Sequence, residues 1–231
     1  MTRSPTHAEY CHERLGDRFA ESLSSYDTRR RVEVLVDMFL TDDMLRGKQV
    51  LDVGCGLGFF SERLVQRGAS VVASDIGPTL VERTRERVGC TGVVADALEL
   101  VTQLGRDRFD GVVSSECIEH TPDPVAAIGQ MVQVVKPGGF LAVSTPNLLW
   151  SPVVRLATRL HLRPFDGYEN FSSWGAIRRV FRDNGAPIVW EQGLHLFPFQ
   201  LPFHRLSKWC DKRCQTLRSL MINICVLAIR Q

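Results

Sequence analysis

Residues 49–61, QVLDVGCGLGFFS, carry the pattern that decides the fold. The apolar, strand-forming residues Val50, Leu51 and Val53 precede a glycine-rich turn, and a run with helical apolar spacing follows through Val65. These two periodicities predict a strand, a turn and a helix in that order. Glycine lets the backbone turn sharply and approach a ligand, and the N-terminus of the helix offers unpaired N–H groups. The stretch therefore predicts a ligand-binding turn.

The spacing of the glycines distinguishes between two kinds of ligand. A dinucleotide-binding turn has the pattern G-x-G-x-x-G, in which the third glycine lets the helix pack on the strand. Counted from Gly54, that third glycine would fall at residue 59, which is Phe59. The observed pattern is G-x-G-x-G, made by Gly54, Gly56 and Gly58, and the acid Asp52 stands two residues before it. A nicotinamide-dependent oxidoreductase is therefore a disfavoured alternative.

The composition indicates an ordinary globular protein. The chain has 231 residues, enough for one α/β domain with a buried core. Its formal net charge of +2 is too small to indicate nucleic-acid binding by itself. There is no apolar run of about 18 residues, the length of a membrane span, and the first residues lack a signal-peptide core. We expect one domain over residues 1–231, a cytoplasmic location and no nucleic-acid partner. The sequence does not indicate an oligomeric state.

The seven cysteines do not form the pattern of a secreted disulfide framework, since their number is odd and they are scattered along the chain. Cys210 and Cys214 form C-x-x-x-C near His204. A zinc site would need a fourth ligand and a tighter pattern. Two thiols on one helix face are the preferred interpretation.

After the glycine turn, strand and helix patterns alternate. We expect strands over residues 70–74, 91–95, 109–114 and 140–145. We expect helices over residues 78–88, 97–104 and 123–135, with a turn at Pro137–Gly139. Such alternation predicts a parallel sheet with helices on both faces. Ligands of these sheets bind beyond the carboxyl ends of the strands.

The flanking segments extend this unit. Residues 1–45 are expected to be a helical lead-in that contains an amphipathic helix over residues 27–40. Arg29, Arg30 and Arg31 form a solvated basic turn, or one of them meets the carboxylate of a cofactor. The C-terminal part predicts helices over 148–163 and 172–184 and strands over 188–191 and 221–229.

Acidic residues follow the second and third strands. Asp75 can accept two hydrogen bonds from ribose hydroxyls, because a carboxylate has two acceptor oxygens, and Ile76 follows it. Asp96 can accept from an adenine amino group while the backbone of Ala97 meets the ring edge. The alternative for both acids is a capping role. For Asp96 the two roles are compatible.

The fourth strand continues into SECIEHTPDP at residues 115–124, which VKPGG and STPN follow at residues 135–139 and 144–147. With the glycine turn and the two acids, this order resembles the ubiquinone-biosynthesis O-methyltransferases within the class I S-adenosylmethionine (SAM)-dependent methyltransferases. The resemblance extends over residues 30–147. It implies a Rossmann-like, seven-stranded, mostly parallel sheet with helices on both faces. It also implies methyl transfer from SAM to a small-molecule acceptor, at oxygen. A methyltransferase-like module that binds SAM without turnover is the alternative.

The resemblance also implies individual roles. The glycines cradle the amino-acid part of SAM, Asp75 holds the ribose, Asp96 and Ala97 lie at the adenine, and Ser115 and Glu116 lie beside the sulfonium. The cofactor-binding residues expected in this way are Asp52, Gly54, Gly56, Gly58, Asp75, Ile76, Asp96, Ala97, Ser115 and Glu116.

Two further expectations concern the residues after the fourth strand. In the quinone branch, residues at the positions of Glu116, Glu119 and His120 are associated with a divalent metal, so Mg²⁺ is an expected second cofactor. The alternative is that Glu119 is exposed to solvent and His120 caps the turn. An acceptor hydroxyl also needs a base. His120, with a reference pKa of about 6.5, is the first candidate and His195 the second.

Residues 148–220 are expected to form the acceptor side, with an aromatic-rich insertion at 193–220. Three interpretations of Leu194–Trp209 remain open: a wall for an apolar or aromatic acceptor, an insertion that packs on the core, or shallow membrane docking through Leu196–Trp209. Further candidates to face the acceptor are Tyr168, Asn170, Phe171 and Trp174.

Overall fold

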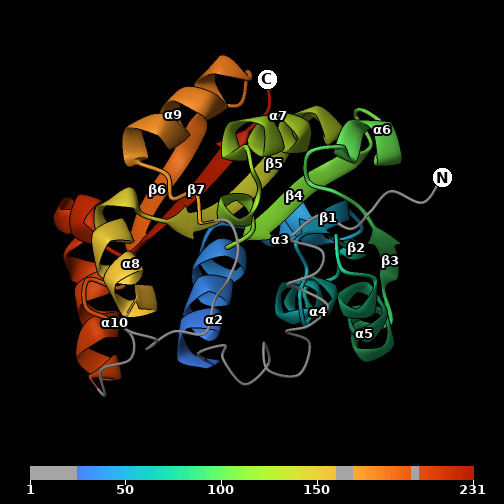
Figure 1. Ribbon diagram of the computed structural model, residues 1–231. Helices are drawn as coiled ribbons and strands as arrows, with labels where there is room; N and C mark the ends of the chain where they lie inside the picture. Colours follow the sequence, from blue (N-terminus) through green and yellow to red (C-terminus); the bar gives the residue numbers. More distant parts are fainter. Residues whose placement is uncertain (1–24, 160–168, 199–202) are drawn as a thin grey trace.

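The structure is a computed structural model that describes residues 25–159, 169–198 and 203–231. In these residues seven strands form one sheet in the order β3-β2-β1-β4-β5-β7-β6 (Figure 1). Strands β1 to β5 are parallel, and β7 runs antiparallel between β5 and β6. The strands are β1 (Gln49–Val53), β2 (Ser70–Asp75), β3 (Thr91–Val94), β4 (Phe109–Ser115), β5 (Val135–Pro146), β6 (Ile188–Leu194) and β7 (Asn223–Ile229). The predicted seven-stranded, mostly parallel sheet is confirmed.

Helices cover both faces of the sheet, as expected. Figure 1 shows α6, α7 and α9 on one face and α2, α4 and α5 on the other. The α-helices are α2 (Ser25–Val32), α3 (Asp42–Leu45), α4 (Phe59–Gln66), α5 (Pro78–Val88), α6 (Leu100–Leu104), α7 (Pro124–Val134), α8 (Ser151–Arg159), α9 (Trp174–Asp183) and α10 (His204–Arg213). The π-helix is η1 (Glu33–Met38), and the 3-10 helices are η2 (Ile118–His120), η3 (Leu148–Trp150) and η4 (Gln215–Leu220). Among the described residues, no helix is both long and apolar enough to cross a bilayer.

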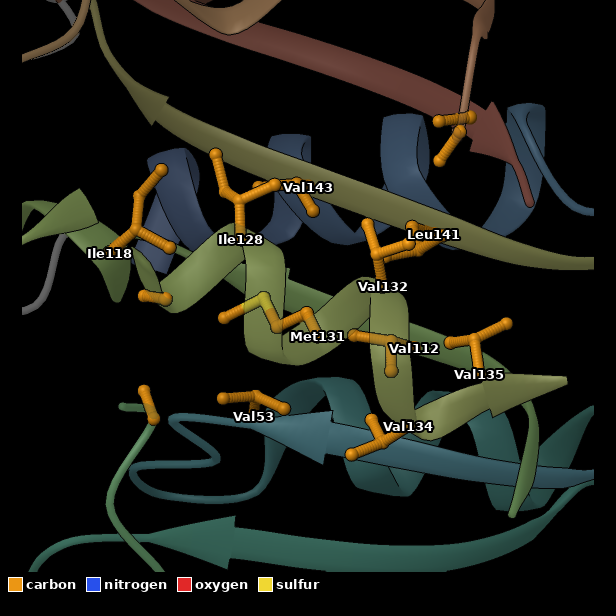
Figure 2. Close-up of a cluster of buried hydrophobic side chains, with 14 of the residues drawn as sticks. Val53, Val112, Ile118, Ile128, Met131, Val132, Val134, Val135, Leu141 and Val143 are labelled. Atoms are coloured by element: carbon orange, nitrogen blue, oxygen red, sulfur yellow. The ribbon is translucent and has the colours of Figure 1, made fainter. Parts of the chain in front are cut away.

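A separate hydrophobic core lies on each face. On the first face, Ile128, Met131 and Val132 of α7 pack against the sheet, and Figure 2 shows them among side chains of β1, β4 and β5 such as Val53 and Val112. The second core packs η1 and α4 on the opposite face, through Val34, Leu35, Phe39, Phe60 and Leu64. The N-terminal helical segment is thus part of the fold and covers one side of the sheet.

Several element boundaries differ from the predicted ones. The helix expected over 27–40 changes to a π-helix at Glu33, where the consecutive residues Val34, Leu35 and Val36 are all buried. Three successive side chains of an α-helix spread over about 200° of its surface, and the larger number of residues per turn in a π-helix narrows that spread, so all three can be covered. The helix expected from residue 97 begins only at Leu100, because the carboxylate of Asp96 accepts from the N–H of Leu98 and forms a turn.

The segment Pro137–Gly139 belongs to β5 rather than to a free turn. The register of β5 against β4 jumps there, from Phe109 opposite Val135 to Gly111 opposite Phe140. Other differences are small: β3 ends at residue 94, β6 extends to 194, β7 begins at 223 and α9 begins at 174. The helix expected over 148–163 consists of η3 and α8 as far as residue 159, and its remainder lies outside the described residues.

Candidate functional site

The turn between β1 and α4 follows a path that glycine alone fits without strain. Gly54, Gly56 and Gly58 have φ angles of 74°, 51° and 79°. A Cβ at Gly54 would lie 2.6 Å from the Sγ of Cys117, and one at Gly58 would lie 2.9 Å from Cγ2 of Thr84. Both a left-handed backbone and close neighbours therefore exclude other side chains.

Asp75 reaches this turn from the end of the neighbouring strand β2. Its Oδ2 accepts from the N–H of Gly56 at 3.0 Å, and its Oδ1 accepts from the N–H of Gly77 at 2.9 Å. A carboxylate offers about four acceptor sites, so each oxygen keeps capacity for a second donor. The acid thus lies beside the glycine turn, and its oxygens can still accept from ligand hydroxyls.

Asp52, in strand β1, connects that strand to the helix after the turn. Its side chain is buried, and its Oδ2 accepts from Oγ of Ser61 on α4 at 2.6 Å. Burial raises the pKa of this carboxyl to about 7. Asp52 therefore fixes the start of α4 against β1, which is a supporting contact to the expected cofactor site.

The second acidic position lies beside the first. Ala95 donates its N–H to the carbonyl of Asp75 at 3.0 Å, so the ends of β2 and β3 are adjacent. Asp96 accepts from the N–H of Leu98 in the turn that follows, but it does not cap the next helix, whose N-cap is Glu99. Ala97 is buried and Ile76 is half-buried at the same edge. One acid, Asp96, and two apolar residues, Ile76 and Ala97, thus lie at the same edge of the sheet as Asp75.

At the end of β4, a chain of hydrogen bonds through two serine hydroxyls connects α2, β4 and β5. Arg31 Nη1 of α2 donates to Oγ of Ser115 at 2.7 Å, and Ser115 Oγ lies 2.9 Å from Oγ of Ser144 on β5. Ser144 also donates to Oε1 of Glu116 at 3.0 Å. Glu116 has a φ of 52°, a left-handed conformation that is uncommon for a residue with a side chain. Such strain often accompanies a functional position.

Hydrogen bonds of Asp27 on α2 continue this chain to His195, which follows β6. Arg31 donates from Nε and Nη2 to Oδ2 of Asp27 at 3.1 and 2.9 Å, and Asp27 Oδ1 lies 2.9 Å from Nε2 of His195. Burial alone would raise the pKa of Asp27, but Arg31 and His195 lower it to about 2. We call Asp27, Arg31, Ser115, Glu116 and His195 the polar cluster.

Two arginines thus depart from the expected solvated basic turn. Arg30 and Arg31 are each only 5% exposed, whereas Arg29 is exposed. Arg30 pairs with Glu33 at 2.5 Å and with Asp211 of α10 at 3.4 Å. The interpretation of a solvated turn is therefore wrong for these two residues, because carboxylates on their own and neighbouring helices bury them in pairs.

Glu119 is buried, so its interpretation as a solvent-exposed residue is wrong. The side chain is 1% exposed, and Thr145 Oγ1 donates to its Oε2 at 3.2 Å. Burial raises the pKa of Glu119 to about 7, and it likewise raises that of Glu116 to about 7. His120 Nε2 lies 3.9 Å from Oε1 of Glu119, with the His120 side chain 24% exposed.

The expected metal site is not formed. Across residues 25–159, 169–198 and 203–231, no group of three His, Cys, Asp or Glu side chains is arranged to hold a metal ion. Glu116 and Glu119 instead accept from Ser144 and Thr145 of β5. The expectation of Mg²⁺ at Glu116, Glu119 and His120 therefore has no support in the side-chain arrangement.

Sequence reasoning overlooked several residues of this region. It assigned no role to Asp27, although Asp27 stands four positions before Arg31 on a helix, a spacing that favours an ion pair. Ser144 and Thr145 belong to a quoted motif, but their hydroxyls had no predicted partner. Asn170 lies next to this region, since its N–H donates to the carbonyl of Glu119 at 2.8 Å, and its expected contact with an acceptor stays a prediction.

The remaining candidates to face an acceptor lie elsewhere or are not described. Trp174 packs in the core of the first face with α9, and Phe171 is half-buried. Tyr168, like residues 199–202 of the expected Leu196–Trp209 segment, lies outside the described residues. A shallow hollow of about 280 Å³ lies between α2, η1 and α4, and its lining includes Arg29, Phe59 and Arg63 but not Asp75.

Similarity to known proteins agrees with this geometry. Residues 51–143 match the methyltransferase domain family. The ubiquinone biosynthesis O-methyltransferase of Xylella fastidiosa is 39% identical over 107 residues, which are 45% of this chain and 44% of that protein. The enzyme of the same name from Pseudomonas aeruginosa (strain LESB58) is 40% identical over 107 residues, 45% of this chain and 46% of that protein. The chain spans less than half the length of the curated relatives it matches.

Solved structures extend the likeness to the rest of the chain. Magnesium protoporphyrin IX methyltransferase from Synechocystis PCC 6803 with bound SAM has a TM-score of 0.67 and 18% identity, over 100% of both chains. A SAM-dependent methyltransferase from Thermotoga maritima, described as a possible histamine N-methyltransferase, has a TM-score of 0.71 and 14% identity, over 96% of this chain and 99% of that one. The chain thus has the class I SAM-dependent methyltransferase fold. The sequence resemblance to ubiquinone-biosynthesis O-methyltransferases is confirmed over the matched residues.

Proposed function

We propose that this protein is a SAM-dependent methyltransferase that acts at an oxygen atom of a small-molecule acceptor of apolar or aromatic character. The observation that carries the proposal is the contact of Asp75 with the glycine turn, inside the segment that matches the methyltransferase domain. The O-methyltransferase names of the relatives support oxygen as the methylated atom.

The residues present fit the cofactor. Gly54, Gly56 and Gly58 turn the backbone at left-handed φ angles and carry no side chain, so the backbone of the turn can approach the amino-acid part of SAM closely. Asp75 would accept from the ribose hydroxyls and Asp96 from the adenine amino group, while Ile76 and Ala97 border the ring. Ser115 and Glu116 would lie beside the sulfonium. When bound, SAM would supply an electrophilic methyl group, which passes to the acceptor oxygen as the carbon–sulfur bond breaks and S-adenosylhomocysteine leaves.

The protein's own contribution is then positioning and proton removal. His120 keeps part of its side chain exposed beside Glu119, whereas His195 is fully buried and its Nε2 is held by Asp27. This difference favours His120 as the base that takes the acceptor's hydroxyl proton. His195 would instead fix α2, and with it Arg31, against the sheet. Once an acceptor is known, His120→Gln should lower kcat by about a hundredfold or more, and His195→Gln should lower it much less.

Calorimetric titration with SAM, S-adenosylhomocysteine and NAD tests the proposal. We expect the first two to bind and NAD not to bind. Asp75→Asn should weaken binding by about tenfold or more, because two ribose hydrogen bonds of about 0.5–1.5 kcal/mol each are impaired. Asp183→Asn is the matched control, since Asp183 is 55% exposed and pairs only with the adjacent Arg182 among the described residues.

The other outcomes separate the alternatives. Binding of NAD without SAM would establish the oxidoreductase alternative. Binding of SAM without transfer of labelled methyl to any of a panel of phenols, catechols and quinols would favour a binding module. Equal affinity of the wild type and Asp75→Asn would exclude the assigned ribose site.

A further inference from the structure

Two short segments carry an unusual share of the exposed apolar side chains. Seventeen large apolar residues are exposed among those described, and ten of them lie within residues 148–156 and 197–220. Single exposed apolar residues are ordinary, but a gathered set indicates an interaction surface. The ten are Leu148, Leu149, Val153, Leu156, Phe197, Phe203, Leu206, Trp209, Leu217 and Leu220. We call them the α8–α10 surface.

The helix α10 is turned with its apolar side outward. Leu206 and Trp209, three positions apart, are 51% and 58% exposed, and Phe203 precedes them at the same spacing with 60% exposed. The side of the helix that faces the protein buries Ser207, Cys210 and Asp211, and two of these three side chains are polar. A surface helix that packs on a core shows the reverse arrangement. The orientation of α10 therefore indicates a partner on its outer side.

The elements of this surface are tied together and to the rest of the fold. Trp150 at the end of η3 donates from Nε1 to the carbonyl of Leu220 in η4 at 2.9 Å. Figure 1 shows α8 and α10 at the same end of the molecule, below β6 and β7. On its inner side, α10 is fixed to α2, since Tyr26 stacks on His204 at 4.0 Å and Lys208 pairs with Glu33 at 2.9 Å. Hydrogen bonds and packing thus connect residues 148–156 to η4, and α10 to α2 and η1.

Positive charges surround the apolar side chains. Residues 148–159 and 203–220 contain seven arginines and lysines, and Asp211, their only carboxylate, has no exposed surface. Lys208 and Arg218 pair with glutamates of other elements. The other five are exposed and make no ion pair within the described residues: Arg155, Arg159, Arg205, Lys212 and Arg213.

We propose that the α8–α10 surface docks on an anionic lipid bilayer, with the apolar side chains in the interfacial layer and the cations at the lipid headgroups. Exposed apolar residues flanked by arginine and lysine are the combination that interfacial helices use. A second copy of the chain fits less well, because an isologous contact would bring like charges from both copies together. The surface does not depend on the proposed methyl transfer.

Flotation of the full chain with lipid vesicles tests the proposal. We expect binding to vesicles that contain about a third phosphatidylglycerol in phosphatidylcholine, weak binding to phosphatidylcholine alone, and release by added salt. The double variant Leu206→Ser, Trp209→Ser should lower the apparent affinity by about tenfold or more. Trp190→Ser is the matched control, because Trp190 is a 46% exposed tryptophan on the edge strand β6 and should leave binding unchanged.

The double variant Lys212→Glu, Arg213→Glu tests the charges separately. It should abolish the preference for vesicles with phosphatidylglycerol over vesicles of phosphatidylcholine alone. Each variant is first shown to bind SAM as the wild type does, so that loss of lipid binding is distinguished from failure of the methyltransferase proposal. Lack of binding to both vesicle types would overturn the inference. So would equal binding of the wild type and the Leu206, Trp209 variant, or a dimer in sedimentation analysis that this variant dissociates.

Discussion

At the residue scale, Gly54 combines two constraints that can be measured apart. Gly54→Ala must adopt a φ near 74° and also place its Cβ 2.6 Å from Sγ of Cys117. Gly89→Ala shares only the first constraint, since Gly89 has a φ of 72° and no atom within 4 Å of its Cβ position. We expect about 1–2 kcal/mol lost in Gly89→Ala and about 1–3 kcal/mol more in Gly54→Ala, by urea denaturation. Equal losses would contradict the close packing of the turn.

Glu119 should make stability depend on pH. Its folded pKa of about 7 lies above the ordinary value of 4.5, because burial penalises the charged form. The folded state therefore binds more protons than the unfolded state between these pH values, and the free energy of unfolding falls as pH rises through them. The loss attributable to Glu119 is about 3 kcal/mol at most.

Urea denaturation at intervals from pH 5 to pH 8 measures this effect. Glu119→Gln should be more stable than the wild type at pH 8 and should show a flatter profile, with Glu116 and Asp52 providing the slope that remains. Glu191→Gln is the control, since its ion pairs lower the pKa of Glu191 and its removal should not flatten the profile in this range. An unchanged slope in Glu119→Gln would contradict the buried, protonated carboxyl.

The residues that sequence could predict are those whose chemistry is local. The glycine turn was recognisable because spacing along one strand and helix determines it, and Asp75 was recognisable because it ends the next strand, at the same edge of the sheet. The pair of Asp27 and His195 joins positions 168 apart, and packing of α2 on the sheet alone brings them together. The same cause hid the burial of Arg30 and Glu119, because the charges that pair with or surround them come from other elements.

At the element scale, strands were predicted better than helix ends. Short apolar runs separated by helical patterns identified the five parallel strands, because a strand of a parallel sheet covered by helices is apolar on both faces. The start of α6 and the π-helix were missed, because one depends on the Asp96 side chain and the other on which side of the helix the sheet covers. The outward orientation of α10 could not be foreseen either, since periodicity alone does not say which side of a helix is buried.

The attachment of α10 to α2 depends on a buried carboxylate. Asp211 has no exposed surface, and it accepts from Arg30 at 3.4 Å and from the N–H of Leu196 at 3.2 Å. Asp211→Asn leaves Arg30 buried with Glu33 as its remaining partner, so we expect a loss of about 3 kcal/mol in urea denaturation. Asp183→Asn should change stability by less than about 0.5 kcal/mol. If Asp211→Asn were as stable as the wild type, contacts other than the Asp211 pair would hold α10.

At the scale of the whole molecule, the parallel half of the sheet followed from the alternation of patterns in the sequence. The placement of β7 between β5 and β6 did not, because its pairing is antiparallel and joins segments that are far apart in the sequence. The resemblance implied only a seven-stranded, mostly parallel sheet, and the order β5-β7-β6 is supplied by the structure. The match to the methyltransferase domain family ends at residue 143, so the surface chemistry of the C-terminal third had to be derived from the structure.

S-adenosylhomocysteine, the product of the cofactor, should stabilise the folded protein against heat. A ligand that binds only the folded state at a hundredfold excess over its Kd adds about 2.7 kcal/mol, which for a chain of this size raises the Tm by about 5–10 °C. S-adenosylhomocysteine should produce this shift in the wild type and, at the same concentration, a smaller one in Asp75→Asn, while NAD should produce none. The Leu206→Ser, Trp209→Ser variant should retain the full shift, because its residues lie on α10 and contact none of the assigned cofactor residues. Loss of the shift in that variant would mean that the α8–α10 surface and the cofactor site form one cooperative unit rather than two separable sites.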